Sequence, residues 1–119
     1  MPNFNKTILA GHLTRDPALK NLPNGTPVCE FALAVNDGYK EKKAVYFFDC
    51  VLFGKGAEVF NQYMAKGRPV LVEGKLQQRR WEDKQGQKRS KIEVNVREFQ
   101  FLGGKESDNG DGGAGDSAV

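Results

Sequence analysis

The residues of this chain best suited to chemistry are basic and aromatic side chains that alternate along two strand-like segments. In residues 70–81 one alternation set contains Lys75, Arg79 and Trp81. Successive side chains of a strand point to opposite faces, so this set is expected to point away from the core. The chain's single tryptophan therefore lies on the polar face. The other set, expected in the core, is Val70, Val72, Gly74 and Leu76.

Residues 44–53 carry aromatic side chains in both alternation sets. One set contains Tyr46, Phe48, Cys50 and Leu52, and the other contains Val45, Phe47, Asp49, Val51 and Phe53. A barrel interior receives only one set, so the other must meet another subunit, a helix or nucleic-acid bases. On the pattern alone, Phe47 and Phe53 could instead be core residues. Phe48 could be a core residue or a subunit contact.

Aromatic side chains interleaved with lysine and arginine suit an unpaired nucleic acid. Bases of any identity stack on aromatic rings for about 1–3 kcal/mol per base, and phosphates require nearby cations. A basic run alone is typical of a solvated strand face, but its interleaving with outward aromatics favours binding. The candidate phosphate contacts are Lys6, Arg15, Lys42, Lys43, Lys55, Lys75, Arg79, Arg80, Lys88 and Arg89.

Metal sites and catalysis have little support. Cys29 and Cys50 fit no metal spacing, and a closed zinc site normally needs four Cys or His ligands, whereas His12 is the only histidine. We expect the cysteines to be small buried residues in a reducing compartment, and His12 to be an exposed residue at a strand end. The only adjacent carboxylates, Glu82 and Asp83, lie at an expected turn. No catalytic residue, metal or cofactor is therefore expected.

Charge and composition change near residue 104. Residues 1–104 carry 17 Lys and Arg against 11 Asp and Glu, whereas residues 105–119 carry one Lys against four acids. A basic body favours a polyanionic partner. The Gly/Asp-rich residues 105–119 have little to bury, so we expect one domain (1–104) and a disordered tail. No apolar run approaches the roughly 18 residues that span a bilayer, and no secretion signal is apparent, so no membrane contact is expected.

Five strands and one helix are expected to position these residues. Gly11, inside the first strand, indicates a bulge or a close backbone approach, residues 36–43 form a polar loop, and Gly67 caps the helix. Five strands with a helix between the third and fourth predict an all-β OB-fold, a five-stranded Greek-key barrel. The expected strands are residues 5–13, 28–35, 44–53, 70–81 and 88–102, and the expected helix is 56–66.

Several short motifs, in their order and spacing, resemble the bacterial-type single-stranded DNA-binding protein family over residues 3–104. They are Asn5–Pro17, Asn24-Gly25, Val51–Lys55, Tyr63-x-x-Lys66-Gly67, Val72–Leu76 and Arg80-Trp81-x-Asp83-x-x-Gly86. The resemblance implies an OB-fold, usually a homotetramer, that binds unpaired DNA with little sequence preference in replication, recombination and repair. It also implies a cytoplasmic, nucleoid-associated protein.

The same resemblance assigns base stacking to Tyr39, Phe47, Phe53 and Trp81. Tyr39 and Phe47 stand where well-studied relatives often have tryptophan, so weaker stacking is expected there. The C-terminus departs from the family pattern, an acidic run closed by a Pro-Phe tip that docks other enzymes. Because this chain ends in Asp116-Ser117-Ala118-Val119, the tip is either shortened away or lost, and recruitment through it is not expected.

Three other functions fit the same fold. An adaptor that mainly contacts proteins would lose little DNA affinity on Trp81→Ala. An RNA-binding module would prefer RNA to DNA of equal sequence. A nuclease would cut DNA with a divalent metal, but its acids should converge in one pocket and here they are scattered.

Overall fold

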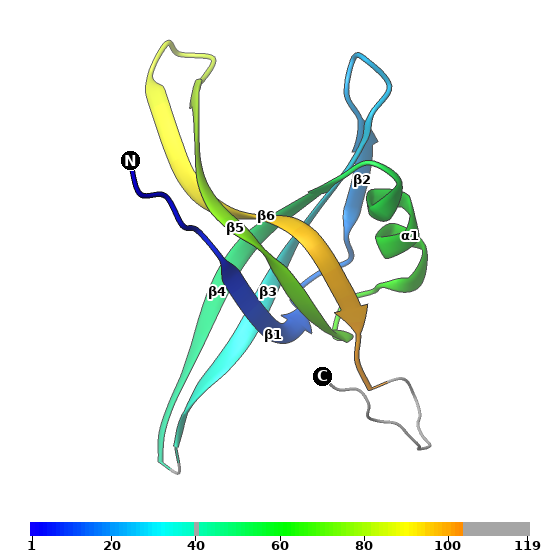
Figure 1. Ribbon diagram of the computed structural model, residues 1–119, viewed down its shortest axis with the longest axis vertical. Helices are drawn as coiled ribbons and strands as arrows, with labels where there is room; N and C mark the ends of the chain where they lie inside the picture. Colours follow the sequence, from blue (N-terminus) through cyan, green and yellow to red (C-terminus); the bar gives the residue numbers. More distant parts are fainter. Residues whose placement is uncertain (40, 104–119) are drawn as a thin grey trace.

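The computed structural model describes residues 1–39 and 41–103, which form six strands and one helix (Figure 1). Five strands close into a barrel, and the helix connects the third of these to the fourth. The predicted all-β barrel with its single helix is therefore confirmed. In chain order the elements are β1 (Thr7–Leu13), β2 (Ala18–Asn21), β3 (Pro27–Tyr39), β4 (Lys42–Phe53), α1 (Lys55–Tyr63), β5 (Pro69–Glu82) and β6 (Lys88–Phe101).

The barrel closes because β1 pairs with two partners. The strands follow the order β1-β5-β6-β4-β3, and β1 returns to pair with β3 at His12 and Leu13. All pairings are antiparallel except that of β4 with β6. At the point of closure, a Cβ on Gly11 would lie 2.5 Å from the carbonyl oxygen of Ala34. The close backbone approach predicted at this glycine is thus confirmed.

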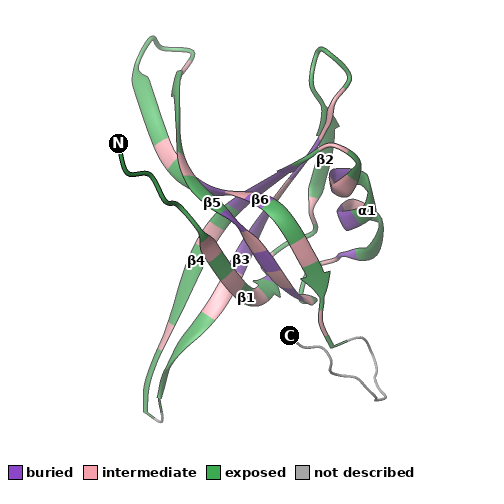
Figure 2. Ribbon diagram, in the orientation of Figure 1, coloured by how far each residue is buried: buried purple, intermediate pink, exposed green. Residues whose placement is uncertain are grey.

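The core lies inside the barrel and under α1 (Figure 2). Phe60 of the helix is fully buried and stacks on Phe31 of β3, with ring centroids 4.2 Å apart. Cys29 and Cys50 are both buried and unbridged, as expected of small core residues. Burial raises the pKa of the Cys29 thiol to about 11 and that of Cys50 to about 12, so both stay protonated at neutral pH.

Two features of the strands differ from expectation. β2 was not predicted, because all four of its residues are exposed and show no alternation of apolar and polar side chains. The polar segment 36–43 was expected to be a loop. Instead, β3 and β4 stay paired as far as Tyr39 and Lys42, and form a hairpin that projects from the barrel (Figure 1). Backbone pairing sustains these strands, although they bury almost no side chain.

Three further expectations were wrong, namely the end of the helix, the capping role of Gly67 and the burial of Leu76. The helix ends at Tyr63 rather than at residue 66, and Gly67 is not its cap: the Gly67 N–H donates to the Leu13 carbonyl (2.9 Å) and joins the connection after α1 to β1. Leu76 is 42% exposed, since β5 leaves the barrel there to form a second projecting hairpin with β6. Val51 shares the alternation set of Phe47 and Phe53, whose side the sequence left open, and it is buried where β4 pairs with both β3 and β6.

The predicted tail, residues 105–119, lies outside the described residues. Within the described part of the chain, no helix is long and apolar enough to cross a membrane.

Candidate nucleic-acid interface

Three neighbouring strands place aromatic and charged side chains on one outer side of the barrel. β6 lies between β4 and β5, and its register with β5 sets Lys91 opposite Arg79. Alternation along each strand then defines the residues that point outward from this sheet. We call this surface the β4–β6–β5 face, which consists of Phe47, Asp49 and Phe53 of β4, Arg89, Lys91, Glu93 and Asn95 of β6, and Lys75, Gln77, Arg79 and Trp81 of β5.

Three of the four predicted stacking residues lie on the β4–β6–β5 face. Phe47 is 69% exposed, Phe53 is 43% exposed and Trp81 is 41% exposed. Leaving large apolar rings in water is unfavourable, and exposed apolar groups rimmed by polar ones commonly mark interaction sites. These rings are therefore available to stack on a partner.

Tyr39, the fourth predicted stacking residue, lies elsewhere. It is 75% exposed near the tip of the β3–β4 hairpin, where it pairs with Lys42. The register puts Tyr39 in the alternation set of Tyr46 and Phe48, which is opposite to the set of Phe47. The structure therefore does not bring Tyr39 onto the β4–β6–β5 face, but onto a projecting arm beside it.

All ten predicted phosphate contacts are exposed, but they do not form one cluster. On the β4–β6–β5 face lie Lys75, Arg79 and Arg89. The β3–β4 hairpin carries Lys42 and Lys43, and Arg80 and Lys88 point to the other side of the β5–β6 hairpin. The remaining three, Lys6, Arg15 and Lys55, flank β1 or begin α1.

Some of these cations already have anionic partners. Lys6 Nζ lies 3.3 Å from Glu73, and Arg89 Nε lies 2.9 Å from Asp83. The bond from Arg89, together with backbone N–H groups of the turn, lowers the pKa of the Asp83 carboxyl. Phosphate binding at such cations competes with an existing ion pair, so each contributes less than an unpaired cation.

A buried carboxylate lies at the centre of the β4–β6–β5 face. Glu93 is 5% exposed, and its oxygens lie 3.4 Å from Arg79 Nε and 3.9 Å from Lys91 Nζ. The Gln77 side-chain amide donates to Glu93 (3.1 Å) and accepts from Asn95 Nδ2 (3.1 Å). A buried charge is stable only when it is paired and hydrogen-bonded, and this network provides both.

Arg79 links this network to the tryptophan. Its guanidinium carbon lies 5.1 Å from the centroid of the Trp81 ring, which is within the range of a cation–π contact. The same side chain therefore contacts the buried Glu93 and the exposed aromatic ring.

Of the four residues that β6 contributes, sequence reasoning predicted Arg89 but missed Lys91, Glu93 and Asn95. The signal was available, because they alternate with Ile92, Val94 and Val96. What the alternation of a single strand does not reveal is which strands flank it. The parallel pairing of β6 with β4 is what places these residues among the predicted aromatics.

A pocket of about 390 Å³ adjoins Phe53 at one end of the β4–β6–β5 face. Arg97 lies on its wall, at the position where the register between β5 and β6 shifts and leaves this residue unpaired. Arg97 is a further exposed cation that the sequence did not single out. The lining residues are Leu52, Phe53, Gly56, Asn95, Val96, Arg97 and Phe99.

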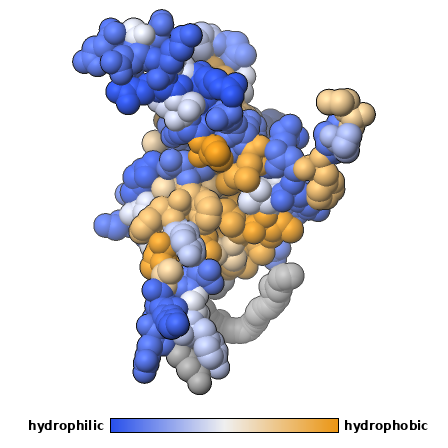
Figure 3. Space-filling model, turned by 90° about the vertical axis from the view of Figure 1, so that its left-hand side faces the viewer, coloured by the Kyte–Doolittle hydropathy of each residue, from blue (hydrophilic) through white to orange (hydrophobic). Residues whose placement is uncertain are grey.

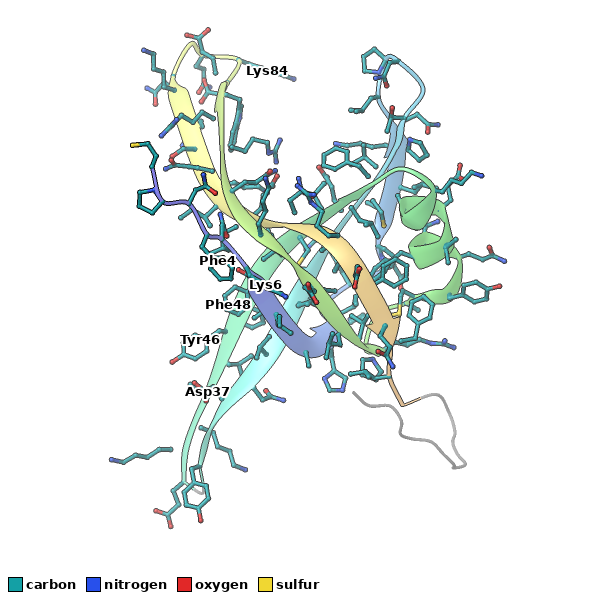
Figure 4. All side chains as sticks on the ribbon, in the orientation of Figure 1. Phe4, Lys6, Asp37, Tyr46, Phe48 and Lys84 are labelled. Carbon is teal, nitrogen blue, oxygen red and sulfur yellow. The ribbon has the colours of Figure 1, made fainter. Side chains whose placement is uncertain are left out.

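A separate apolar surface lies on the side of the molecule shown in Figure 3, between the hydrophilic tips of the two hairpins. Tyr46 and Phe48 project from β4 toward this side, close in the view to Phe4 of the segment before β1 (Figure 4). Phe4 is 91% exposed and Tyr46 51% exposed, while Phe48 is partly buried. Phe48 is therefore not a fully buried core residue in the single chain.

Comparisons with a family profile, with known sequences and with solved structures all find single-strand binding proteins. Residues 4–102 match the profile of the single-strand binding protein family. Proteins named single-stranded DNA-binding protein are similar to this chain: that of Wolinella succinogenes is 41% identical over 90% of the chain, and that of Treponema pallidum is 44% identical over 87%. The chain covers 69% and 60% of these relatives' own lengths.

Among solved structures, a complex titled "Plasmodium falciparum SSB complex with ssDNA" has a similar fold. Its TM-score is 0.77 at 26% identity, and the match covers 86% of this chain and 97% of that chain. The likeness thus extends over nearly the whole barrel.

Proposed function

The chain belongs to the single-strand binding protein family, and on that premise we propose that it coats and protects unpaired DNA, with little sequence preference, in replication, recombination and repair. The observation that carries the proposal is the β4–β6–β5 face, where exposed aromatic rings lie among lysine and arginine side chains. Neither feature reads base identity, which accounts for tolerance of sequence.

Binding combines two physical terms. Bases stack on Phe47, Phe53 and Trp81, each stack contributing about 1–3 kcal/mol. Phosphates follow the cations around these rings, and their neutralisation releases counterions. The β3–β4 hairpin extends the path with Tyr39 and its neighbouring lysines. The proposed phosphate contacts, three on the face and the others elsewhere on the exposed surface, are Lys6, Arg15, Lys42, Lys43, Lys55, Lys75, Arg79, Arg80, Lys88 and Arg89.

Titration with oligo(dT), with Trp81 fluorescence as the readout, tests this function. We expect quenching on binding, and a log K that falls with log salt by about 0.7 per phosphate contact. A chain that neither quenches nor binds at low salt would not have the proposed function.

We further infer that binding involves no catalysed step and no cofactor. Incubation of labelled single-stranded DNA with the protein and Mg²⁺ should leave the strand intact, whereas cleavage would favour the nuclease alternative. Competition between oligo(dT) and the RNA of equal sequence tests the RNA-binding alternative. That alternative requires the RNA to bind more tightly and to displace the DNA.

We also propose a homotetramer that acts in the cytoplasm at the nucleoid. Support for assembly comes from the apolar surface around Phe4 and Tyr46, which a second copy would cover. Two buried, unbridged thiols suit a reducing compartment. Recruitment of other enzymes by a C-terminal tip is not part of the proposal.

A further inference from the structure

We propose that Glu93 is a positioning residue, which holds Arg79 against Trp81 and so sets the geometry of the DNA-binding face. The inference rests on the proposed function. In the proposed binding mode, Glu93 itself contacts neither a base nor a phosphate. The basis of the inference is that the only buried charged side chain in the described part of the chain lies at the centre of the β4–β6–β5 face.

A carboxylate on a phosphate-binding face needs a reason to be there. By Coulomb's law alone it repels DNA, and burying it has a desolvation cost as well. Glu93 offsets that cost with Arg79, Lys91 and a hydrogen bond from Gln77. The arrangement is consistent with a carboxylate whose role is to orient its cationic neighbours.

Arg79 is the neighbour whose orientation matters. Its Nε lies 3.4 Å from Glu93, while its guanidinium carbon lies over the Trp81 ring, 5.1 Å from the centroid. Guanidinium carries five N–H donors in a rigid fork, so contact at Nε leaves the terminal nitrogens to meet a phosphate. Arg79 thus lies over one face of the Trp81 ring, which stays 41% exposed and able to stack on a base.

Asp49 provides a matched contrast on the same face. It is also an acid, but its side chain is 49% exposed, and its single described ion pair is a long one to Lys91, at 3.7 Å. It contacts neither Arg79 nor Trp81 in the described interactions. If charge alone mattered, neutralising either acid would strengthen DNA binding. If Glu93 positions Arg79, the two changes have opposite signs.

The experiment compares Glu93→Gln with Asp49→Asn in oligo(dT) titrations of the full chain. We expect Asp49→Asn to raise affinity about two- to fivefold, because it removes a repelling charge and releases Lys91. Glu93→Gln should lower affinity, by roughly fivefold or more, although it too makes the face more positive. In the DNA-free protein, iodide should quench Trp81 fluorescence more strongly in Glu93→Gln than in the parent, because Arg79 no longer covers the ring.

Two further variants separate positioning from loss of folding. Arg79→Lys keeps the charge at an exposed position but loses the planar fork, and should lower affinity in a barrel with unchanged thermal unfolding. In an Arg79→Ala background, Glu93→Gln should no longer lower affinity and should raise it as Asp49→Asn does.

Outcomes are distinguishable from failure of the proposed function. If the parent chain does not bind oligo(dT), the function fails. If the parent binds and Glu93→Gln binds as tightly or more tightly, the function stands and the positioning role of Glu93 is wrong. The role is equally wrong if the loss in Glu93→Gln persists unchanged in the Arg79→Ala background.

Discussion

Substitution of Trp81 is the most direct test of the proposed DNA binding. The Trp81 ring is 41% exposed and contacts Arg79, so truncation removes a stacking surface and a cation–π partner together. Trp81→Ala should weaken oligo(dT) binding about 5- to 150-fold, the equivalent of one lost stack. Fluorescence anisotropy of a labelled oligonucleotide measures this without the tryptophan signal.

Tyr63→Ala is the matched control, since Tyr63 is 53% exposed but lies on α1. Its affinity should equal that of the parent chain. Equal affinity of Trp81→Ala and the parent would instead favour the adaptor function, in which DNA contact is secondary.

The two cysteines give a residue-scale prediction about pH. Folding raises the thiol pKa values from 9.0 to about 11 for Cys29 and about 12 for Cys50. The unfolded chain therefore releases these protons first as pH rises. The associated stability is fully present below pH 9.0 and is lost as pH increases above it.

Urea unfolding from neutral pH to above pH 9.0 measures this loss. The double variant Cys29→Ala/Cys50→Ala lacks the thiols and should show a smaller decline than the parent, although its cavities lower stability at every pH. Parallel declines in both proteins would show that the thiols do not contribute.

Which residues form the site was only partly predictable at this scale. Trp81 and Phe47 could be placed by alternation, because outward aromatics are rare without a partner. Glu93 could not be, since its importance depends on contacts with Arg79 and Gln77 across a strand pair. Such contacts follow from register, which includes a shift between Glu73 and Gly74 that no local pattern indicates.

Among the elements, the β5–β6 turn is organised by one side chain. Asp83 accepts hydrogen bonds from the backbone N–H groups of Gln85 and Gln87, each at 2.9 Å, and from Arg89 Nε. Asp83→Ala should therefore speed amide exchange at Gln85 and Gln87, while amides of buried β6 residues such as Val94 stay protected. Hydrogen exchange followed by NMR resolves the two groups.

Lys84→Ala is the control at the same hairpin tip (Figure 4), because no described interaction of the turn depends on its side chain. The lowered pKa of Asp83 gives the sign of the pH effect: its contribution is present above the ordinary value of 3.8 and is lost as pH falls below it. An Asp83 pKa at or above 3.8 by NMR titration would contradict this account of the turn.

The larger elements were predictable and their ends were not. The barrel strands carry apolar residues in alternation, which is a strong signal where one face is buried. β2 and the outer part of the β3–β4 hairpin bury little, so their backbone pairing has no side-chain signature. The helix end depended on where the chain turns back to meet Leu13, a contact distant in sequence.

For the whole molecule, the apolar surface around Phe4 and Tyr46 is where assembly can be tested. Phe4→Asp combined with Tyr46→Asp would place two charges against the same surface of another copy. We expect the assembly mass, measured by light scattering, to fall below that of the parent protein, for which we propose a tetramer. The control Val59→Asp puts a charge on a half-exposed position of α1 and should leave the mass unchanged. A double variant that keeps the parent's mass would place the subunit contact elsewhere.

The parallel pairing of β4 with β6 has a consequence for how the protein is made. In β4, Cys50 and Val51 pair with Val94 and Asn95 of β6, which lie more than forty residues later in the chain. β6 can therefore take its place between β4 and β5 only after both of those strands have been synthesised. During translation the aromatic rings of β4 and β5 emerge first, without the strand that joins them into one surface. A growing chain therefore assembles the β4–β6–β5 face only after β6 has emerged from the ribosome, so this surface is completed near the end of synthesis of the barrel.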